Sequence, residues 1–427
     1  MNRKNRSKKH LLGTALCFLL LSPQAASAHL FDATIPGTQM SLQQCFEMAN
    51  QQNLQIQAGR KSVERAKVMQ GTAWDVDKTE IAFSQNPSTG GDTDNGFTFS
   101  QGIEFPTVYT ARRRQLKSET QAEKSRLGVI NQQLKTDIAT AYYAMLYHTY
   151  RLHILQRQDS ILDRYCIVAE KRYKAGEARQ LEFLSAERMR NENHLKMANV
   201  KSEVETQQTY LMALLNTDQP VKPAENDLLV LATKQNAAAF NYQQTADAQY
   251  QQDRIAALDN EVKCAKTGYA PSLSLSIRTQ CVISSWNPYH VDRSRFTEGN
   301  FFGFELGVGV PLFFGATKAK VRAAKKDLEV AQLEMQQEQR EKERDYKLCI
   351  RRLNNAEKQL KYYEDENDAK AEKIADLSTQ EYESGKISYV EYVNALRETI
   401  DMRMKHADVI NEYNEALLAL MSLTNSL

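Results

Sequence analysis

Long hydrophobic runs are missing from most of this 427-residue chain. After residue 28, no apolar stretch approaches the length of about 18 residues that a membrane-spanning helix needs. The mean hydropathy of the chain is −0.57. The sequence therefore predicts no transmembrane helix in the mature chain. Strands of a transmembrane barrel stay possible, because their alternating residues average out in a hydropathy profile.

Cysteines and catalytic motifs are also scarce. The mature chain is left with five scattered cysteines: Cys45, Cys166, Cys264, Cys281 and Cys349. Their odd number and the lack of a Cys-x-x-Cys spacing argue against a disulfide framework and a metal site. There is no His-Glu-x-x-His, Gly-x-Ser-x-Gly or phosphate-binding glycine loop, and acidic pairs such as Asp365 and Glu366 lie in charged helix. We expect neither an enzyme nor a cofactor.

A large excess of charge of one sign is lacking too. The whole chain has 55 basic and 53 acidic residues. Its first 28 residues hold five basic and no acidic ones, which leaves 50 basic against 53 acidic residues, a formal charge of −3, in the rest. This balance gives no reason to expect a nucleic-acid partner.

The first 28 residues are typical of a signal peptide. Five basic residues open the segment: Arg3, Lys4, Arg6, Lys8 and Lys9. The apolar run 11–21 follows, and Ala26-Ser27-Ala28 supplies a small-x-small cleavage site. An N-terminal membrane anchor is the alternative, but the run is too short to span a bilayer. Cys17 lies inside that run, so we expect no lipid attachment there. We predict an exported chain that begins at His29.

Two parts of the chain resemble each other at one constant offset, which indicates an internal duplication. Three residues recur 209 positions later: Tyr173, Gly176 and Glu182 against Tyr382, Gly385 and Glu391. The same offset relates segment 211–216 to segment 420–425. We predict a first repeat over 29–219, a linker over 220–240 that contains two prolines, and a second repeat over 241–427.

Glycine and proline are nearly absent from two long stretches. Segment 111–173 contains no proline and only Gly128, and segment 316–382 contains neither residue. Seven-residue spacing of apolar or small residues marks the first stretch: Leu127, Leu134 and Ala141, and Ile138, Met145 and Leu152. Helices of about 60 residues would be roughly 90–100 Å long, so their apolar stripes need neighbouring helices. Shorter helices are predicted at about 42–71 and 241–268. An ordinary extended coiled coil fits the helices alone.

Four alternating segments favour a membrane sheet over such a scaffold. We predict strands at about 79–85, 96–105, 272–283 and 302–312, joined by polar loops over 86–95 and 282–300. One face of each strand is apolar and the other is polar or glycine, as in Phe97, Phe99, Ile103 and Phe105, and in Phe302, Phe304, Leu306, Val308, Val310 and Leu312. A soluble sheet packed on the helices is the alternative. Four strands cannot close a barrel, and open edges are not tolerated in lipid. Three copies of four strands would supply twelve.

With these features in this order, the chain resembles the TolC family of outer-membrane efflux proteins. The resemblance spans nearly all of the mature chain. It is carried by the opening helix 41–50, the Gly-Val-Pro-Leu-Phe-Phe-Gly run 309–315, the two Tyr-x-x-Gly turns and the duplicated leucine-rich helix ends. It implies an α+β membrane protein: a homotrimer with a 12-stranded transmembrane β-barrel, four strands per chain, continued by a long α-helical coiled-coil barrel in the periplasm.

The resemblance also implies function, location and partners. It implies the outer-membrane channel of a tripartite efflux system, with a periplasmic adaptor (membrane fusion) protein and an inner-membrane pump of the RND type. Segment 100–109 is similar to the heavy-metal branch, the CzcC- and CusC-like ducts, which implies metal cations as cargo; drugs or other small molecules are the alternative. Unlike many relatives, this chain has no cysteine directly after Ala28. The rival function is a periplasmic or surface coiled-coil structural or adhesion protein.

Because a duct performs no bond chemistry, its functional residues are expected in a gate and in docking surfaces. By resemblance, Tyr382 matches a gating tyrosine, and Glu391 and Asn394 match acidic aperture rings, with asparagine where the family often has aspartate. Three Glu391 carboxylates around one axis would attract cations; a solvated helix face is the alternative. Residues at the two glycine turns are expected to meet the adaptor: Ala175, Gly176, Glu177, Ser384, Gly385 and Lys386. Helix capping alone would also explain both glycines.

Smaller features complete the expectations for the strand ends. Pro106, Pro271 and Pro311 suit elbows between strands and helices, because proline fixes φ and removes a hydrogen-bond donor. Trp286 and Tyr289, in the second polar loop, are expected near the outer headgroup level.

Overall fold

The computed structural model describes residues 35–87, 93–225, 227–232, 240–281, 300–364 and 367–426. The predicted signal peptide, Trp286 and Tyr289 lie outside these residues. From Gly37 to Leu427 the chain forms one compact unit, which spans the predicted first repeat from residue 37 onward, the linker and the second repeat.

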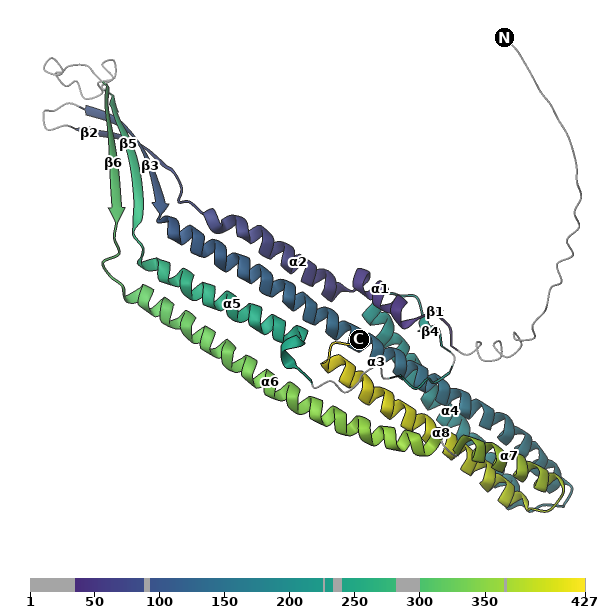
Figure 1. Cartoon of the computed structure of the whole chain (residues 1–427). Helices are drawn as coiled ribbons and strands as arrows, with labels where there is room; N and C mark the ends of the chain where they lie inside the picture. Colours follow the sequence, from purple (N-terminus) through teal and green to yellow (C-terminus); the bar gives the residue numbers. More distant parts are fainter. Residues whose placement is uncertain are drawn as a thin grey trace, which may run out of the picture. The chain divides into compact units, whose positions relative to one another are not determined.

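Long helices dominate the described chain (Figure 1). The helices are α1 (Leu42–Gln52), α2 (Leu54–Met69), α3 (Pro106–Lys174), α4 (Gln180–Leu215), α5 (Ala246–Lys266), α6 (Gly315–Glu364), α7 (Asn367–Glu383) and α8 (Tyr389–Leu423). Short 3-10 turns follow α2 (Gln70–Trp74), precede α5 (Tyr242–Gln244) and follow α5 (Thr267–Tyr269). Among the described helices, none combines the length and the apolar composition that crossing a bilayer requires.

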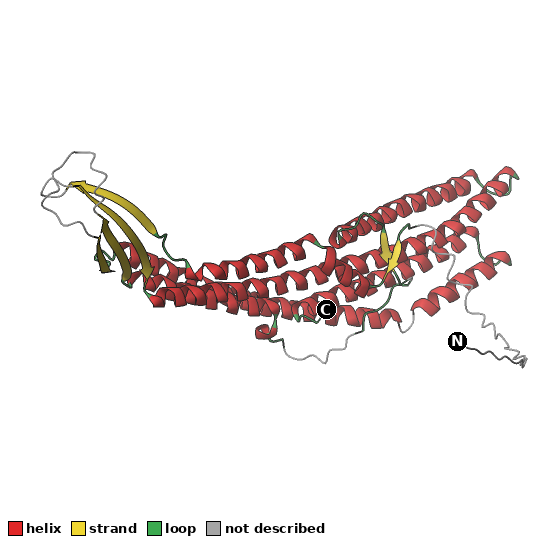
Figure 2. Cartoon of the chain, turned by 90° about the horizontal axis from the view of Figure 1, so that it is seen from above, coloured by secondary structure: helices red, strands yellow, loops and turns green. Residues whose placement is uncertain are grey.

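Four long strands form one antiparallel sheet in the order β2-β3-β5-β6 (Figure 2). The strands are β2 (Glu80–Pro87), β3 (Thr93–Glu104), β5 (Ser272–Cys281) and β6 (Asn300–Gly309). Each hairpin pairs neighbours in sequence, and the central β3–β5 pair joins segments far apart in the chain, with Phe99 opposite Ile277. The predicted strands are thus confirmed in position, with shifted ends. Phe105 caps α3 instead of extending β3, because Pro106 occupies the first helical position.

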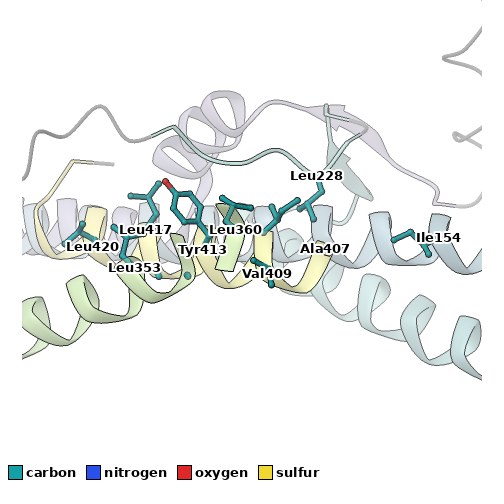
Figure 3. Packing of buried hydrophobic residues seen from close by; sticks show 12 residues of the cluster. Ile154, Leu228, Leu353, Leu360, Ala407, Val409, Tyr413, Leu417 and Leu420 are labelled. Carbon is teal, nitrogen blue, oxygen red and sulfur yellow. The ribbon is translucent and has the colours of Figure 1, made fainter. Parts of the chain in front are cut away.

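The helices pack around α3, which contacts α2, α4, α5 and α8. The seven-residue pattern predicted for α3 points inward: Leu134, Ile138, Met145 and Leu152 are buried. A separate cluster joins α6 to α8 through Leu353, Leu360, Tyr413, Leu417 and Leu420, with Ile154 of α3 and Leu228 at its margin (Figure 3). These apolar stripes bury surface that no single long helix could remove from water.

One helix prediction was wrong in detail. The helix expected over 42–71 is divided at Asn53, whose backbone (ψ 128°) is extended. The Asn53 side chain accepts from the backbone N–H groups of Gln55 and Ile56 and donates to the carbonyl of Leu214 (2.8 Å). Asparagine is a strong N-cap, so one residue ends α1 and starts α2. In the stretch 316–382, the described residues form α6 and α7, and residues 365–366 between them lie outside the description.

A second, two-stranded sheet was not predicted from the sequence. β1 (Thr38–Met40) pairs in parallel with β4 (Val221–Pro223), within the expected linker. Tyr142 of α3 fastens this sheet, since its hydroxyl donates to the Met40 carbonyl (2.9 Å), bonds the Glu225 carboxylate and accepts from the Ala224 N–H (3.2 Å). Three-residue strands are too short for an alternation pattern to reveal them.

Candidate functional site

Two tight turns, one between α3 and α4 and one between α7 and α8, have the same hydrogen-bond geometry. Gly176 and Gly385 sit at their centres with φ of 75° and 71°. In the first turn the N–H groups of residues 175, 176, 177 and 178 donate to the carbonyls of 171, 173, 172 and 172. In the second turn every one of these bonds recurs 209 residues later. Glycine is required at both centres, because a side chain strains the left-handed region.

The six residues expected to meet an adaptor lie on the surface of these turns. All of them are exposed: Ala175, Gly176, Glu177, Ser384, Gly385 and Lys386. The turns therefore present backbone, short side chains and the charged side chains of Glu177 and Lys386 to solvent. The docking role stays a prediction, and the capping role of the two glycines is visible in the hydrogen bonds.

Glu391 lies at the start of α8, in a capping box with Ser388. The Glu391 carboxylate accepts from the Ser388 N–H (2.8 Å), while the Ser388 hydroxyl accepts from the Glu391 N–H (3.3 Å). These hydrogen bonds lower the pKa of the exposed Glu391 carboxyl below its usual range. The residue is thus ionised, exposed and held by the backbone. Asn394, almost one helical turn further along α8, is also exposed.

Tyr382 belongs to a tyrosine cluster that sequence reasoning missed. Its ring stacks on Tyr392 (centroids 4.7 Å apart, planes 8° apart) and meets Tyr389 edge to face (6.0 Å, 73°). Tyr389 in turn stacks on Tyr165 of α3 at 3.7 Å. Burial raises the pKa of Tyr165, so its hydroxyl stays neutral. Contacts between tyrosine rings therefore run without a break from Tyr382, across the start of α8, to Tyr165 of α3.

A small apolar cluster fixes this region. Leu162 and Ala169 of α3, Ala186 of α4 and Val393 of α8 are buried together, with Tyr389 and Tyr392 packed against them. The spacing of Tyr382, Tyr389 and Tyr392 near a glycine turn was the available signal for the cluster. The partner Tyr165 carried none, since 224 residues separate it from Tyr389.

The four-stranded sheet offers a second candidate surface. Its registers place the apolar residues of all four strands on one face, with Ile81 opposite Phe99, Phe99 opposite Ile277, and Ile277 opposite Phe304. This face is exposed, with 71% of Phe304 and 73% of Leu306 accessible. The other face carries Ser, Thr, Gly and a few charged side chains. Contiguous apolar patches of this kind mark surfaces that are covered in use.

The described residues contain no group of three or more His, Cys, Asp or Glu side chains placed to hold a metal ion. The four cysteines whose side chains are described are free thiols: Cys45, Cys166, Cys264 and Cys349. Burial raises the pKa of Cys45 to about 11, so this thiol is protonated and inert.

Comparison with known proteins relates the second half of the chain to a family and the whole fold to solved channels. Residues 242–426 match the family described as outer membrane efflux protein. The sequence matches none of the curated proteins. The structure is similar to CusC (14% identity, 91% of this chain and 93% of that chain covered, TM-score 0.71). It is also similar to the outer-membrane channel OprN (16%, 90% and 89%, 0.72) and to the CmeC outer membrane channel of Campylobacter jejuni (13%, 90% and 85%, 0.71). The resemblance predicted from the sequence is confirmed.

Proposed function

Since residues 242–426 match the outer membrane efflux protein family and the chain has the fold of such channels, we propose that this protein is the outer-membrane channel of a tripartite efflux system. In this proposal it exports small solutes from the periplasm to the exterior. It works with a periplasmic adaptor and an inner-membrane pump of the RND type. Heavy-metal cargo stays a prediction, because CusC is one of several channels with this fold.

The exposed apolar face of the sheet is the observation that carries the proposal. A face with Phe302, Phe304, Leu306 and Val308 in solvent would be costly in water, at about 25 cal/mol per Å². Lipid removes that cost. The outer edges of β2 and β6 pair with no other strand among the described residues, and unpaired edges are not tolerated in lipid. Further copies of the chain are therefore needed, and three copies close a twelve-stranded barrel.

The two-repeat organisation belongs to the same proposal. The turns centred on Gly176 and Gly385 share one hydrogen-bond pattern. After the ends of α4 and α8, Asn216 and Asn425 both adopt the left-handed backbone conformation, with φ of 53°. In the proposed trimer these turns form the tip that meets the adaptor. The first strand pair and the second strand pair each connect a shorter helix to a long one.

We assign the aperture to Tyr382, Glu391 and Asn394. The tyrosine stack holds Tyr382 against the start of α8, and the capping box holds the charge of Glu391 at a fixed height. Three ionised carboxylates at one level around an axis favour cations. Both interactions involve the first turn of α8, so a movement of this helix end would move Tyr392, which contacts Tyr382, and the charge of Glu391 together.

Planar-bilayer conductance of the purified mature protein tests this function. Wild type is compared with Tyr382→Ala, Glu391→Gln and Ser388→Ala. Glutamine keeps the capping box but removes the charge, whereas Ser388→Ala keeps the charge and removes the hydroxyl cap. We expect discrete cation-selective openings, larger in Tyr382→Ala, and selectivity lost in Glu391→Gln but retained in Ser388→Ala.

Each other result removes part of the proposal. Openings that none of the substitutions changes would keep the channel and refute the aperture. A folded, helical protein that neither inserts nor conducts would refute the channel and favour the coiled-coil scaffold instead.

A further inference from the structure

All four connections between the sheet and the helices lie at one end of the sheet, by its register. β3 ends at Glu104 and α3 starts at Pro106; β6 ends at Gly309 and α6 starts at Gly315. At the same end of the sheet, the 3-10 turns ending at Trp74 and Tyr269 lead into β2 and β5, the first strands of the two hairpins. The first turns of α3 and α6 therefore lie next to the boundary of the exposed apolar face.

Aromatic side chains mark this boundary at both hairpins. Trp74 stacks on Tyr109 (5.1 Å, 12°), and Tyr269 meets Phe314 (5.8 Å, 46°). Trp74 is 62% exposed, and Phe313, which precedes Phe314 in the sequence, is 93% exposed. Tryptophan and tyrosine gather where hydrocarbon meets headgroups. If the sheet lies in a membrane, as proposed above, these pairs place the headgroup level at the start of the helices.

In the helix segments just beyond this level, every charged residue is basic. Residues 106–118 of α3 and 315–326 of α6 contain nine lysines and arginines and no acidic residue. Arg112 is paired with Glu104 (2.8 Å) and Lys326 with Glu329. For the seven others no ion pair is recorded among the described residues; we call them the basic collar: Arg113, Arg114, Lys117, Lys318, Lys320, Arg322 and Lys325.

The collar is unfavourable for the helices themselves, because Arg113 and Lys117, and Lys318 and Arg322, are like charges four residues apart on one helix face. Lys318 also lies in the first turn of α6, where the partial positive charge of the helix end repels a cation. Neither α3 nor α6 has an acidic residue in its first turn. An arrangement that costs folding energy indicates a negative partner outside the chain. Long side chains on a helix also lean toward its N-terminus, which directs the collar toward the sheet.

Part of the collar lines a groove. Arg114 and Lys117 border a space of about 650 Å³ between α2, α3 and α5, together with Lys67 and Lys124. The carboxylate in this groove, Asp253, is engaged by Ser125, Gln121 and Gln249. The groove is therefore open and positively charged, with four basic side chains against one carboxylate, and has room for a phosphodiester headgroup.

We propose that the basic collar binds the headgroups of anionic phospholipids in the leaflet facing the helices, and so sets the depth of the channel in the membrane. The proposal rests on the membrane placement of the sheet proposed above. It gives the chain an electrostatic attachment at the membrane surface, since polybasic segments beside a membrane are attracted to anionic lipid. The attraction weakens with salt.

The test titrates the detergent-purified mature protein with phosphatidylglycerol or with phosphatidylcholine of the same acyl chains, and follows the melting temperature at low and high salt. The collar variant is Lys318→Gln/Lys320→Gln/Arg322→Gln. The control variant, Lys347→Gln/Arg351→Gln/Lys358→Gln, removes two lysines and one arginine, all exposed, from the middle of the same helix.

We expect phosphatidylglycerol to raise the melting temperature of wild type and control above the value in phosphatidylcholine, and high salt to abolish the difference. The collar variant should bind phosphatidylglycerol less tightly, about fivefold for each cation removed. Without anionic lipid, it should be at least as stable as wild type, because the repulsion between Lys318 and Arg322, and between Lys318 and the helix end, is gone. A collar that only supports the fold would instead destabilise the protein in both lipids.

Three results would overturn the proposal. They are an equal response of the collar variant and wild type to phosphatidylglycerol, an equal loss in the control variant, and the same stabilisation by inorganic phosphate at matched concentration. Conductance in phosphatidylcholine bilayers separates this proposal from the function. A wild type that conducts there but shows no preference for phosphatidylglycerol refutes the collar alone, whereas a wild type that never conducts refutes the channel.

Discussion

The ring of Tyr382, the last aromatic residue of α7, lies flat against Tyr392 of α8, with centroids 4.7 Å apart and planes 8° apart. The backbone turn at Gly385 brings the two rings together. The stack therefore joins the end of α7 to the start of α8 across this turn.

Removing the ring of Tyr382 should loosen this end of α7. We expect Tyr382→Ala to lower the free energy of unfolding by about 1–2 kcal/mol, since stacked aromatic pairs contribute about 0.5–1.5 kcal/mol beyond burial. Tyr382→Phe keeps the stack and should stay close to wild type. Thermal unfolding of the purified protein measures both. An equal loss in the two variants would show that the hydroxyl, and not the ring, holds α7.

The pH dependence of selectivity tests Glu391. Hydrogen bonds to Ser388 lower the pKa of Glu391 in the folded protein. The ionised form, and any stability that it contributes, is therefore fully present above the ordinary glutamate pKa of about 4.3. It is lost as the pH falls through the lowered pKa of the folded state. Cation selectivity of wild type should therefore be equal at neutral pH and at pH about 5, and fall only in stronger acid. Glu391→Gln should show a flat, weakly selective profile. Reversal potentials in single-channel records decide; a loss of selectivity near neutral pH would assign it to another group.

Much of the fold followed from local pattern, because its main elements are long and regular. Alternation in segments such as 302–308 revealed the strands, and the absence of glycine and proline revealed α3. Contacts between distant residues carried no such signal. Asn53, which divides the predicted helix, bonds the carbonyl of the distant Leu214. Tyr165 joins the tyrosine cluster from a separate helix. For the site, the glycine turns were predictable from φ preference alone, but the use of Glu391 in a capping box requires the position where α8 begins.

Alanine at Gly385 should strain the turn. With φ at 71°, a Cβ adopts a disfavoured conformation even though nothing lies within 4 Å of it, so Gly385→Ala should cost about 1–2 kcal/mol. Gly385→Asn should cost less, because asparagine tolerates the left-handed region. The matched control is Gly128→Ala inside α3, where a Cβ also meets nothing; it should stabilise the protein by about 0.5–1 kcal/mol. Urea or thermal unfolding of the three variants gives the order, and equal effects at 128 and 385 would refute the conformational argument.

Asn414 ties the segment between the two predicted repeats to α8. Its buried side chain donates to the carbonyl of Leu229 (2.8 Å) and accepts from the N–H of Leu231 (2.9 Å). Asn414→Ala leaves both backbone groups without this partner, so we expect a loss of about 2–3 kcal/mol and faster amide hydrogen exchange at Leu231. Asn411→Ala is the control, since Asn411 bonds Glu415 on its own helix and its loss should change stability by less than about 0.5 kcal/mol. If exchange at Leu231 is as slow in Asn414→Ala as in wild type, the segment is held by the packing of Leu228 instead, and Leu228→Ala should then release it.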